Sequence, residues 1–124
     1  MLSSFGEALG LDHELALRVA GAFGGGMARM GETCGAVTGA FMVIGLQYGK
    51  VKAEADKARE QTYELVREFV TQFKARHGSI VCRELLGSDL NKPEERDAAL
   101  HKGLFDTICP RLVRDAVEIV EEIL

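Results

Sequence analysis

Apolar residues recur at intervals of three and four along most of this chain, which is the period of a helix packed on one face. The longest such stripe lies within 54–77 and consists of Ala58, Thr62, Leu65, Val66, Phe69, Val70 and Phe73. The sequence has no alternating run of apolar and polar residues bounded by turn residues, so strands are not expected. The pattern predicts an all-α protein, a small helical bundle of five to six helices joined by short connections.

Capping residues and glycines mark where these helices should begin and end. The residues expected at helix starts are Asp12, Thr33, Ser79, Pro93 and either Asp106 or Thr107, with Pro110 in the first turn of the last helix. The corresponding helices are expected over 12–23, 34–48, 54–77, 79–86, 94–102 and from 106 or 107 to 124. Residues 1–10 resemble the end of a helix whose beginning is missing. No linker or repeat interrupts these segments, so they fit a single domain, 1–124.

Charge and hydropathy argue against several classes of partner. The net charge is −4 and charges of both signs are interspersed, so no nucleic acid is expected as a ligand. No apolar run approaches the ~18 residues that a membrane span needs, so no membrane insertion is expected. The first residues lack a basic segment followed by an apolar run, and we therefore expect a cytoplasmic protein without a signal peptide.

Three consecutive glycines precede Cys34 in the segment GGGMARMGETCGAVTG, residues 24–39. The shape GxxxxG-x-T at 26–33 resembles a phosphate loop, but Glu32 stands where that motif requires lysine, and a helix rather than a strand precedes it. We expect these glycines to end one helix and turn the chain towards the next. A small-anion site at 24–35, formed by backbone N–H groups together with Arg29, is an alternative.

The three cysteines, Cys34, Cys82 and Cys109, are expected in or near the first turns of helices. Unpaired N–H groups and the positive end of the helix dipole favour a thiolate there, so Cys34 and Cys109 are candidates for reactive thiols. The spacing contains no CxxC, so a shared site can form only if the fold brings the three together. Buried structural cysteines are the alternative, because cysteine often only fills space in a core.

Glycines and histidines supply the remaining candidates. Glycine inside a helix costs up to ~1 kcal/mol relative to alanine, so close packing or a nearby ligand should offset this cost at Gly35, Gly39 and Gly45. His77 lies five residues before Cys82 and is the best metal partner among the histidines. Each of the three histidines is more simply interpreted as a solvated surface residue.

The cysteine segments carry a family resemblance. CGAVTG at 34–39 matches the CGAxxG motif of the C_GCAxxG_C_C family of redox-active proteins, and residues 10–49 resemble that family's central block. HGSIVCRELLG and FDTICPRLVRDAVEI resemble its third and fourth cysteine segments. The family pattern has four cysteines, and three occupy matching positions here: Cys34, Cys82 and Cys109. The first family cysteine would precede LSSFGEALGLD, and this sequence reaches Met1 before it.

The resemblance implies a cysteine-based redox-active or metal-binding protein whose redox thiols are Cys34, Cys82 and Cys109. Two thiols in disulfide range would support thiol–disulfide exchange with a redox partner protein. Three converging thiols could instead bind a soft metal ion or an iron–sulfur cluster, with water, a histidine such as His77 or a second chain as the fourth ligand. The candidate cofactor-binding residues are Gly35, Gly39 and Arg29.

A non-catalytic helical interaction module with structural cysteines is the alternative from a different functional class. No general base stands beside a recognisable nucleophile, so neither a reaction nor a substrate follows from the sequence. A homodimer is a candidate assembly, because the apolar first helix could pair with a second copy.

Overall fold

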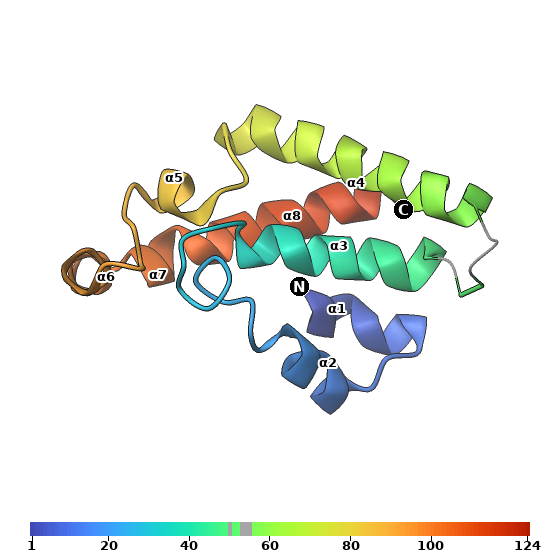
Figure 1. Ribbon diagram of the computed structural model, residues 1–124, viewed down its shortest axis with the longest axis horizontal. Coiled ribbons are helices and arrows are strands. Elements are labelled where there is room, and N and C mark those ends of the chain that lie inside the picture. The colour runs from blue at the N-terminus through green and yellow to red at the C-terminus, as the bar shows by residue number, and fades with distance from the viewer. Residues whose placement is uncertain (50, 53–55) are drawn as a thin grey trace.

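Three long helices form the centre of the molecule. The computed structural model describes residues 1–49, 51–52 and 56–124. In it α3 (Gly35–Tyr48), α4 (Asp56–His77) and α8 (Cys109–Ile123) pack against one another (Figure 1). The predicted all-α bundle is confirmed, and the β-type pairing found in the described ranges is one isolated bridge between Thr33 and Val81.

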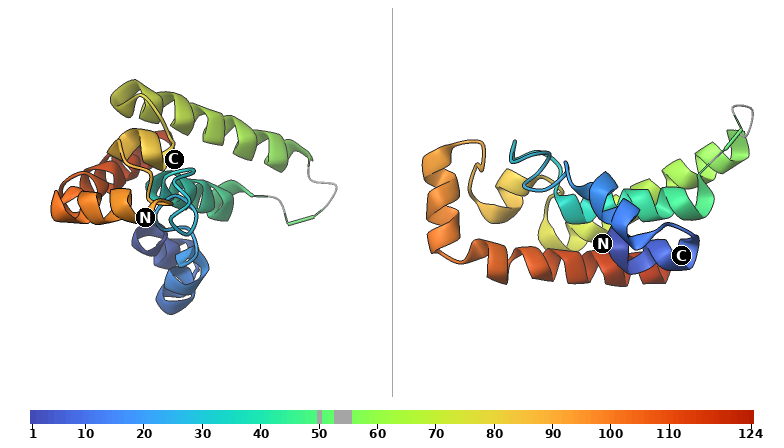
Figure 2. Two further views of the ribbon diagram at one scale, coloured as in Figure 1. Left: turned by 60° about the vertical axis from the view of Figure 1, so that its left-hand side comes forward. Right: turned by 90° about the horizontal axis from the view of Figure 1, so that it is seen from below.

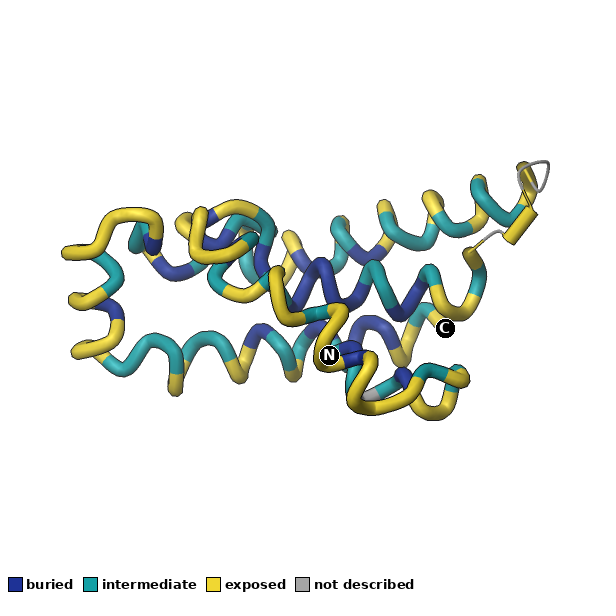
Figure 3. The backbone as a smooth tube through the Cα atoms, turned by 60° about the horizontal axis from the view of Figure 1, so that its bottom comes forward, coloured by how far each residue is buried: buried dark blue, intermediate teal, exposed yellow. Residues whose placement is uncertain are grey.

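The central position of α3 follows from its composition. Its buried residues lie on all sides of the helix and are Ala36, Val37, Thr38, Gly39, Ala40, Val43 and Ile44. A helix that is apolar all round is stable only when other elements surround it. The other two long helices each bury one stripe, which comprises Phe69 and Phe73 on α4 and Leu112, Ala116, Ile119 and Val120 on α8. Figure 3 shows this burial concentrated where the three helices meet.

The N-terminal segment lies against one side of α3. It comprises α1 (Leu2–Gly6), a short 3-10 helix (Glu7–Leu9) and α2 (His13–Ala20), with α1 in contact with both α2 and α3 (Figure 1). A Cβ added to Gly39 would lie 2.7 Å from the Cβ of Met1, so the close packing expected at Gly39 is confirmed. At Gly45 no atom of the described chain lies within 4 Å of an added Cβ, so the expectation of close packing there is wrong.

Short helices form the other end of the bundle. They are α5 (Cys82–Leu86), α6 (Pro93–His101) and α7 (Leu104–Thr107), and α7 leads directly into α8 (Figures 1 and 2). This end has a hydrophobic cluster of its own, separate from the main core, whose buried members are Cys82, Leu86, Leu90 and Ala99. The described residues therefore form two hydrophobic clusters, and Ile108, at the start of α8, packs against both. None of the helices in the described part of the chain is long and apolar enough to cross a membrane.

Two predicted helix starts are confirmed, and the helix that follows one of them is shorter than expected. The N–H of Leu15 donates to Asp12 Oδ2 at 3.0 Å, and Pro93 is the first residue of α6. However, α2 ends at Ala20 instead of reaching Phe23, which lies in the following turn. Only one α2 residue is buried, while its large apolar side chains are about half-exposed: Leu15 47%, Leu17 54% and Val19 49%.

Three other predicted starts are displaced by a few residues. The N-cap of α3 is Cys34, because the backbone of Thr33 instead pairs with Val81. Ser79 Oγ accepts a hydrogen bond from the Val81 N–H at 3.0 Å, so it stabilises the turn before α5 without capping that helix. The residues expected to start the last helix, Asp106 and Thr107, lie in the separate helix α7. The predicted start of α4 at 54–55 falls outside the described residues, and that helix is described from Asp56.

Candidate functional site

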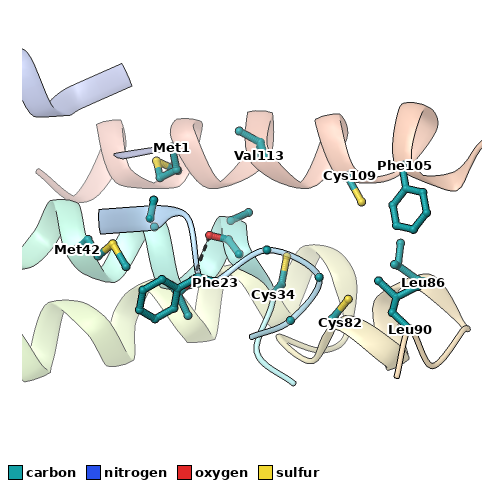
Figure 4. A pocket seen from close by; sticks show the side chains of 18 residues that line it. Met1, Phe23, Cys34, Met42, Cys82, Leu86, Leu90, Phe105, Cys109 and Val113 are labelled. Atoms are coloured by element: carbon teal, nitrogen blue, oxygen red, sulfur yellow. Dashed lines mark hydrogen bonds between the residues drawn. The ribbon is translucent and has the colours of Figure 1, made fainter. Parts of the chain in front are cut away.

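Three cysteines from three separate helices line one cavity of about 330 Å³. Cys34 is the N-cap of α3, Cys82 is the first residue of α5 and Cys109 is the first residue of α8. Figure 4 shows their sulfur atoms facing the space between these helices. All three are free thiols. The fold therefore brings together three cysteines that lie far apart in the sequence.

The cavity lies between the two hydrophobic clusters. Cys34 belongs to the main core, whereas Cys82 belongs to the smaller cluster and Cys109 packs against it. Apolar side chains supply most of the remaining wall, and the largest are Met1, Phe23, Met42, Leu86, Leu90, Phe105 and Val113. None of these was predicted to line a site, because nothing in their local pattern separates a cavity wall from an ordinary core.

Backbone pairing fixes the two buried cysteines beside each other. The N–H of Cys34 donates to Ile80 O at 2.8 Å, and the N–H of Cys82 donates to Glu32 O at 2.6 Å, on either side of the Thr33–Val81 bridge. These bonds form a short antiparallel pair between the segments that precede α3 and α5. In a regular antiparallel pair such diagonal neighbours lie about 7–8 Å apart, with their Cβ atoms somewhat closer, which is still more than the roughly 3.5–4.5 Å between the Cβ atoms of a disulfide. The pairing therefore agrees with two reduced cysteines.

A left-handed turn delivers the chain to Cys34. Five consecutive residues have positive φ, at +67° and +70° for Gly25 and Gly26 and at +66°, +51° and +66° for Met27, Ala28 and Arg29. Residues other than glycine rarely adopt this conformation, which costs each about 1–2 kcal/mol. Loop N–H groups stabilise the turn by donating to loop carbonyls, for example Arg29 to Gly24 O at 3.0 Å and Glu32 to Gly26 O at 2.9 Å. The loop is thus strained and internally bonded, and is not the simple glycine turn that the sequence suggested.

Hydrogen bonds also attach this loop to α5. The N–H of Arg83 donates to Gly31 O at 3.2 Å, and its guanidinium lies 3.1 Å from Glu32 Oε1. The same guanidinium donates to Gly31 O at 3.2 Å. Glu32, which excluded a phosphate loop in the sequence, therefore holds α5 against the loop.

Burial raises the pKa of all three thiols. The pKa of Cys82 rises to about 11, chiefly because burial disfavours the thiolate and secondarily because Cys34, Cys109 and Asp89 would repel its charge. Burial is also the main cause of the raised pKa of Cys109, with Cys34 adding to it. The three thiols face one cavity, and a charge on one of them disfavours a charge on another.

The start of α3 lowers the pKa of Cys34, as expected, but burial raises this pKa by more. The amides of Ala36 and Val37, in the first turn of α3, lower the pKa of Cys34, yet burial raises it by more. The causes that act on Cys109 both raise its pKa, and its helix follows α7 through Ile108, which is itself helical at φ −90° and ψ −50°. The thiols are therefore held protonated at neutral pH.

The other predicted site residues are divided between this cavity and other places. Gly35 and Gly39 line the cavity beside the thiols. His77 does not line it: its Nε2 lies 2.8 Å from Asp115 Oδ2, and its ring packs 4.8 Å from the Phe73 ring. Arg29 lines a second cavity beside the glycine loop, here called the outer cavity.

The donors around the cavity do not form a metal site as they are placed. Among the residues that the structure describes, no group of three His, Cys, Asp or Glu side chains is arranged to hold a metal ion. His77, the expected fourth ligand, is paired with Asp115 away from the cysteines. A soft metal ion would require the thiols to move towards one another and to lose their protons.

The fold and the site together define a small all-helical protein in which three protonated thiols face one apolar cavity. The profile of the family described as "Putative redox-active protein (C_GCAxxG_C_C)" matches residues 1–123. The chain belongs to this family, and the resemblance inferred from its cysteine segments is confirmed. Comparisons with curated proteins and with solved structures gave no significant match.

Proposed function

We propose that this protein is a thiol-based reductant, in which two of the three cavity cysteines reduce a disulfide substrate. The observation that carries the proposal is the convergence of Cys34, Cys82 and Cys109 on one cavity. In the first step a thiolate attacks one sulfur of the substrate disulfide, forming a mixed disulfide and releasing one thiol. A second cysteine then attacks the protein sulfur, which releases the second substrate thiol. Two protein thiols become one protein disulfide, and the substrate takes up the two electrons and two protons.

The raised pKa values support a reducing role. A disulfide is a strong oxidant when the thiolates of its reduced form are stabilised, and a low thiol pKa indicates such stabilisation. Burial does the opposite here for Cys34, Cys82 and Cys109, so the reduced state gains no such stabilisation. We therefore expect a low reduction potential, which favours giving up electrons.

Exposure indicates which cysteine a substrate reaches first. Cys34 is 8% exposed and Cys82 6%, whereas Cys109 is only partly buried. We assign the attack to Cys109 and the resolving step to one of the two more buried thiols. The redox partner protein expected from the sequence would fit the same scheme, as the carrier of the substrate disulfide.

The test is to treat the reduced native protein with hydroxyethyl disulfide and to follow its thiols by mass spectrometry. We expect one intramolecular disulfide and two released mercaptoethanol molecules per chain. Cys109→Ser should abolish the reaction, whereas a variant lacking the resolving cysteine should stop at the mixed disulfide. Three thiols that stay unmodified in the folded protein would contradict the proposal and favour the interaction module with structural cysteines.

Binding of a soft metal ion or cluster by the same thiols stays a prediction. Elemental analysis of protein purified without chelator tests it directly. A stoichiometric metal that disappears in all three single Cys→Ser variants would replace the dithiol scheme, because coordinated thiolates are not free to attack a disulfide.

A further inference from the structure

A second cavity, larger than the first, adjoins the thiol cavity. Its volume is about 730 Å³, and it lies between the glycine loop and α6. The two cavities share four wall residues, Gly24, Gly25, Leu90 and Phe105. Figure 4 places Leu90 and Phe105 at the end of the thiol cavity where Cys82 and Cys109 lie. The two cavities therefore adjoin at Leu90, Phe105 and the backbone of Gly24 and Gly25.

The outer cavity is positively charged in an otherwise acidic chain. The charged residues in its wall are Arg29, Arg96 and Asp97, against a net charge of −4 for the whole protein. Within the described ranges neither arginine has a carboxylate oxygen within 4 Å, whereas Arg83 and Arg76 are both engaged in ion pairs. Two guanidinium groups without such partners favour the binding of an anion, which they can contact through paired N–H groups.

The strained loop gives Arg29 its position. Arg29 is the last of the five residues with positive φ, and the Gly25 and Ala28 that precede it also line the outer cavity. Strain of this kind persists only where the surrounding structure enforces it, and it is concentrated at functional sites. Several loop N–H groups are used within the loop, so the anion site expected from backbone N–H groups is better placed on the arginine side chains.

We propose that the outer cavity binds the anionic end of the substrate, so that the substrate class is a low-mass disulfide bearing a carboxylate or another anionic group. This inference rests on the proposed function. With its anionic group between Arg29 and Arg96, the disulfide end reaches past Phe105 to the Cys109 thiol. Attack by the Cys109 thiolate forms the mixed disulfide and releases the distal half of the substrate as a thiol. A second cysteine then forms the protein disulfide and releases the other half.

Two disulfide reagents that differ in charge test this assignment at pH 8. One is 5,5′-dithiobis(2-nitrobenzoate), which carries two carboxylates, and the other is 4,4′-dithiodipyridine, which is neutral. The variant combines Arg29→Gln with Arg96→Gln. Arg67→Gln is the control, because Arg67 is exposed on α4 and lines neither cavity. Circular dichroism verifies that all variants are folded.

We expect the double variant to react about tenfold more slowly with the anionic reagent and less than about twofold more slowly with the neutral one. Added salt should slow the anionic reagent in the unmodified protein and have little effect in the double variant. Replacing both arginines by lysine should restore much of the rate lost with the anionic reagent. In the otherwise unmodified protein, Asp97→Asn should increase the rate with that reagent.

Equal slowing with both reagents, or no slowing with either, would overturn the assignment of the outer cavity. A different result would refute the proposed function itself: no reaction of the unmodified protein with either reagent, although its thiols react after unfolding. The two failures are therefore distinguishable.

Discussion

Gly26 and Cys82 approach each other so closely that no side chain fits between them. A Cβ built on Gly26 would lie 2.6 Å from the Cβ of Cys82 and 2.7 Å from the backbone N of Glu32. Gly26 also has φ +70°, which side-chain-bearing residues rarely adopt. The strained loop thus packs against the first residue of α5 with no side chain between them. This contact fixes the position of the Cys82 thiol.

Gly26→Ala should be strongly destabilising. The positive φ costs about 1–2 kcal/mol, and the overpacking against Cys82 and Glu32 adds about 1–3 kcal/mol. Gly78→Ala is the matched control, because Gly78 has φ +82° but nothing in the described chain within 4 Å of an added Cβ. Urea unfolding of both variants measures the difference. Equal losses of stability would show that the contact with Cys82 contributes nothing.

Ala28→Gly should preserve or raise the stability. Ala28 has φ +51°, so glycine relieves about 1–2 kcal/mol of strain and gives back about 0.5–1 kcal/mol of that in chain entropy. Ala75→Gly makes the same chemical change at an exposed position inside α4, where it should cost about 1 kcal/mol. Thermal unfolding should therefore shift to lower temperature for Ala75→Gly and should stay unchanged or shift to higher temperature for Ala28→Gly. A loss at Ala28 as large as that at Ala75 would contradict the left-handed conformation of the loop.

Gly39→Ala and Gly45→Ala should have opposite effects, although both lie in α3. At position 39 the new methyl group would meet Met1 Cβ at 2.7 Å, so we expect a loss of about 1–3 kcal/mol. At position 45 it would meet no atom of the described chain within 4 Å, so the better helix propensity of alanine should add up to about 1 kcal/mol. The midpoints of urea unfolding give both values. Stabilisation by both substitutions would show that Met1 moves aside freely.

The stability of the protein should fall at alkaline pH because of its thiols. The pKa of Cys82 is raised from 9.0 to about 11, so the folded state holds its proton more tightly than the unfolded chain does. The resulting stabilisation is fully present below pH 9 and is lost as the pH rises from 9 to 11, by an amount on the order of 2–3 kcal/mol.

Melting temperatures of the unmodified protein and of Cys82→Ser between pH 8 and pH 11 measure this effect. The curve of the variant should be flatter, because lysine and tyrosine ionisation affects both proteins alike. Two parallel curves would mean that the Cys82 thiol ionises with equal ease in the folded and unfolded states.

Local signals in the sequence predicted the helices well. Asp12 and Pro93 act at helix starts because capping depends on neighbouring residues alone. Phe69 and Phe73 of the predicted stripe are buried and its other five members are partly buried, because a period near 3.6 places one face on the core. The exposed apolar face of α2 could not be foreseen, because the pattern shows that a face is apolar and not whether another element covers it.

The site was predictable only in part. The resemblance of the cysteine segments to a family identified all three thiols, but their common cavity depends on the bridge between Thr33 and Val81, which no local pattern indicates. The left-handed turn was missed because Met27, Ala28 and Arg29 individually disfavour positive φ, so only the surrounding hydrogen bonds impose it. The outer cavity was missed for a similar reason, since Arg96 is distant from the glycine loop in the sequence.

The thiol cavity also gives this fold a mechanical property. A cavity of about 330 Å³ between two hydrophobic clusters is volume that the molecule can lose. Hydrostatic pressure favours states with fewer internal voids, so compression should act first at the boundary between the clusters. The end formed by α5, α6 and α7 would then lose its packing at a lower pressure than the centre formed by α3, α4 and α8. The cavity that brings the three sulfurs together is therefore also a place where we expect compression to act.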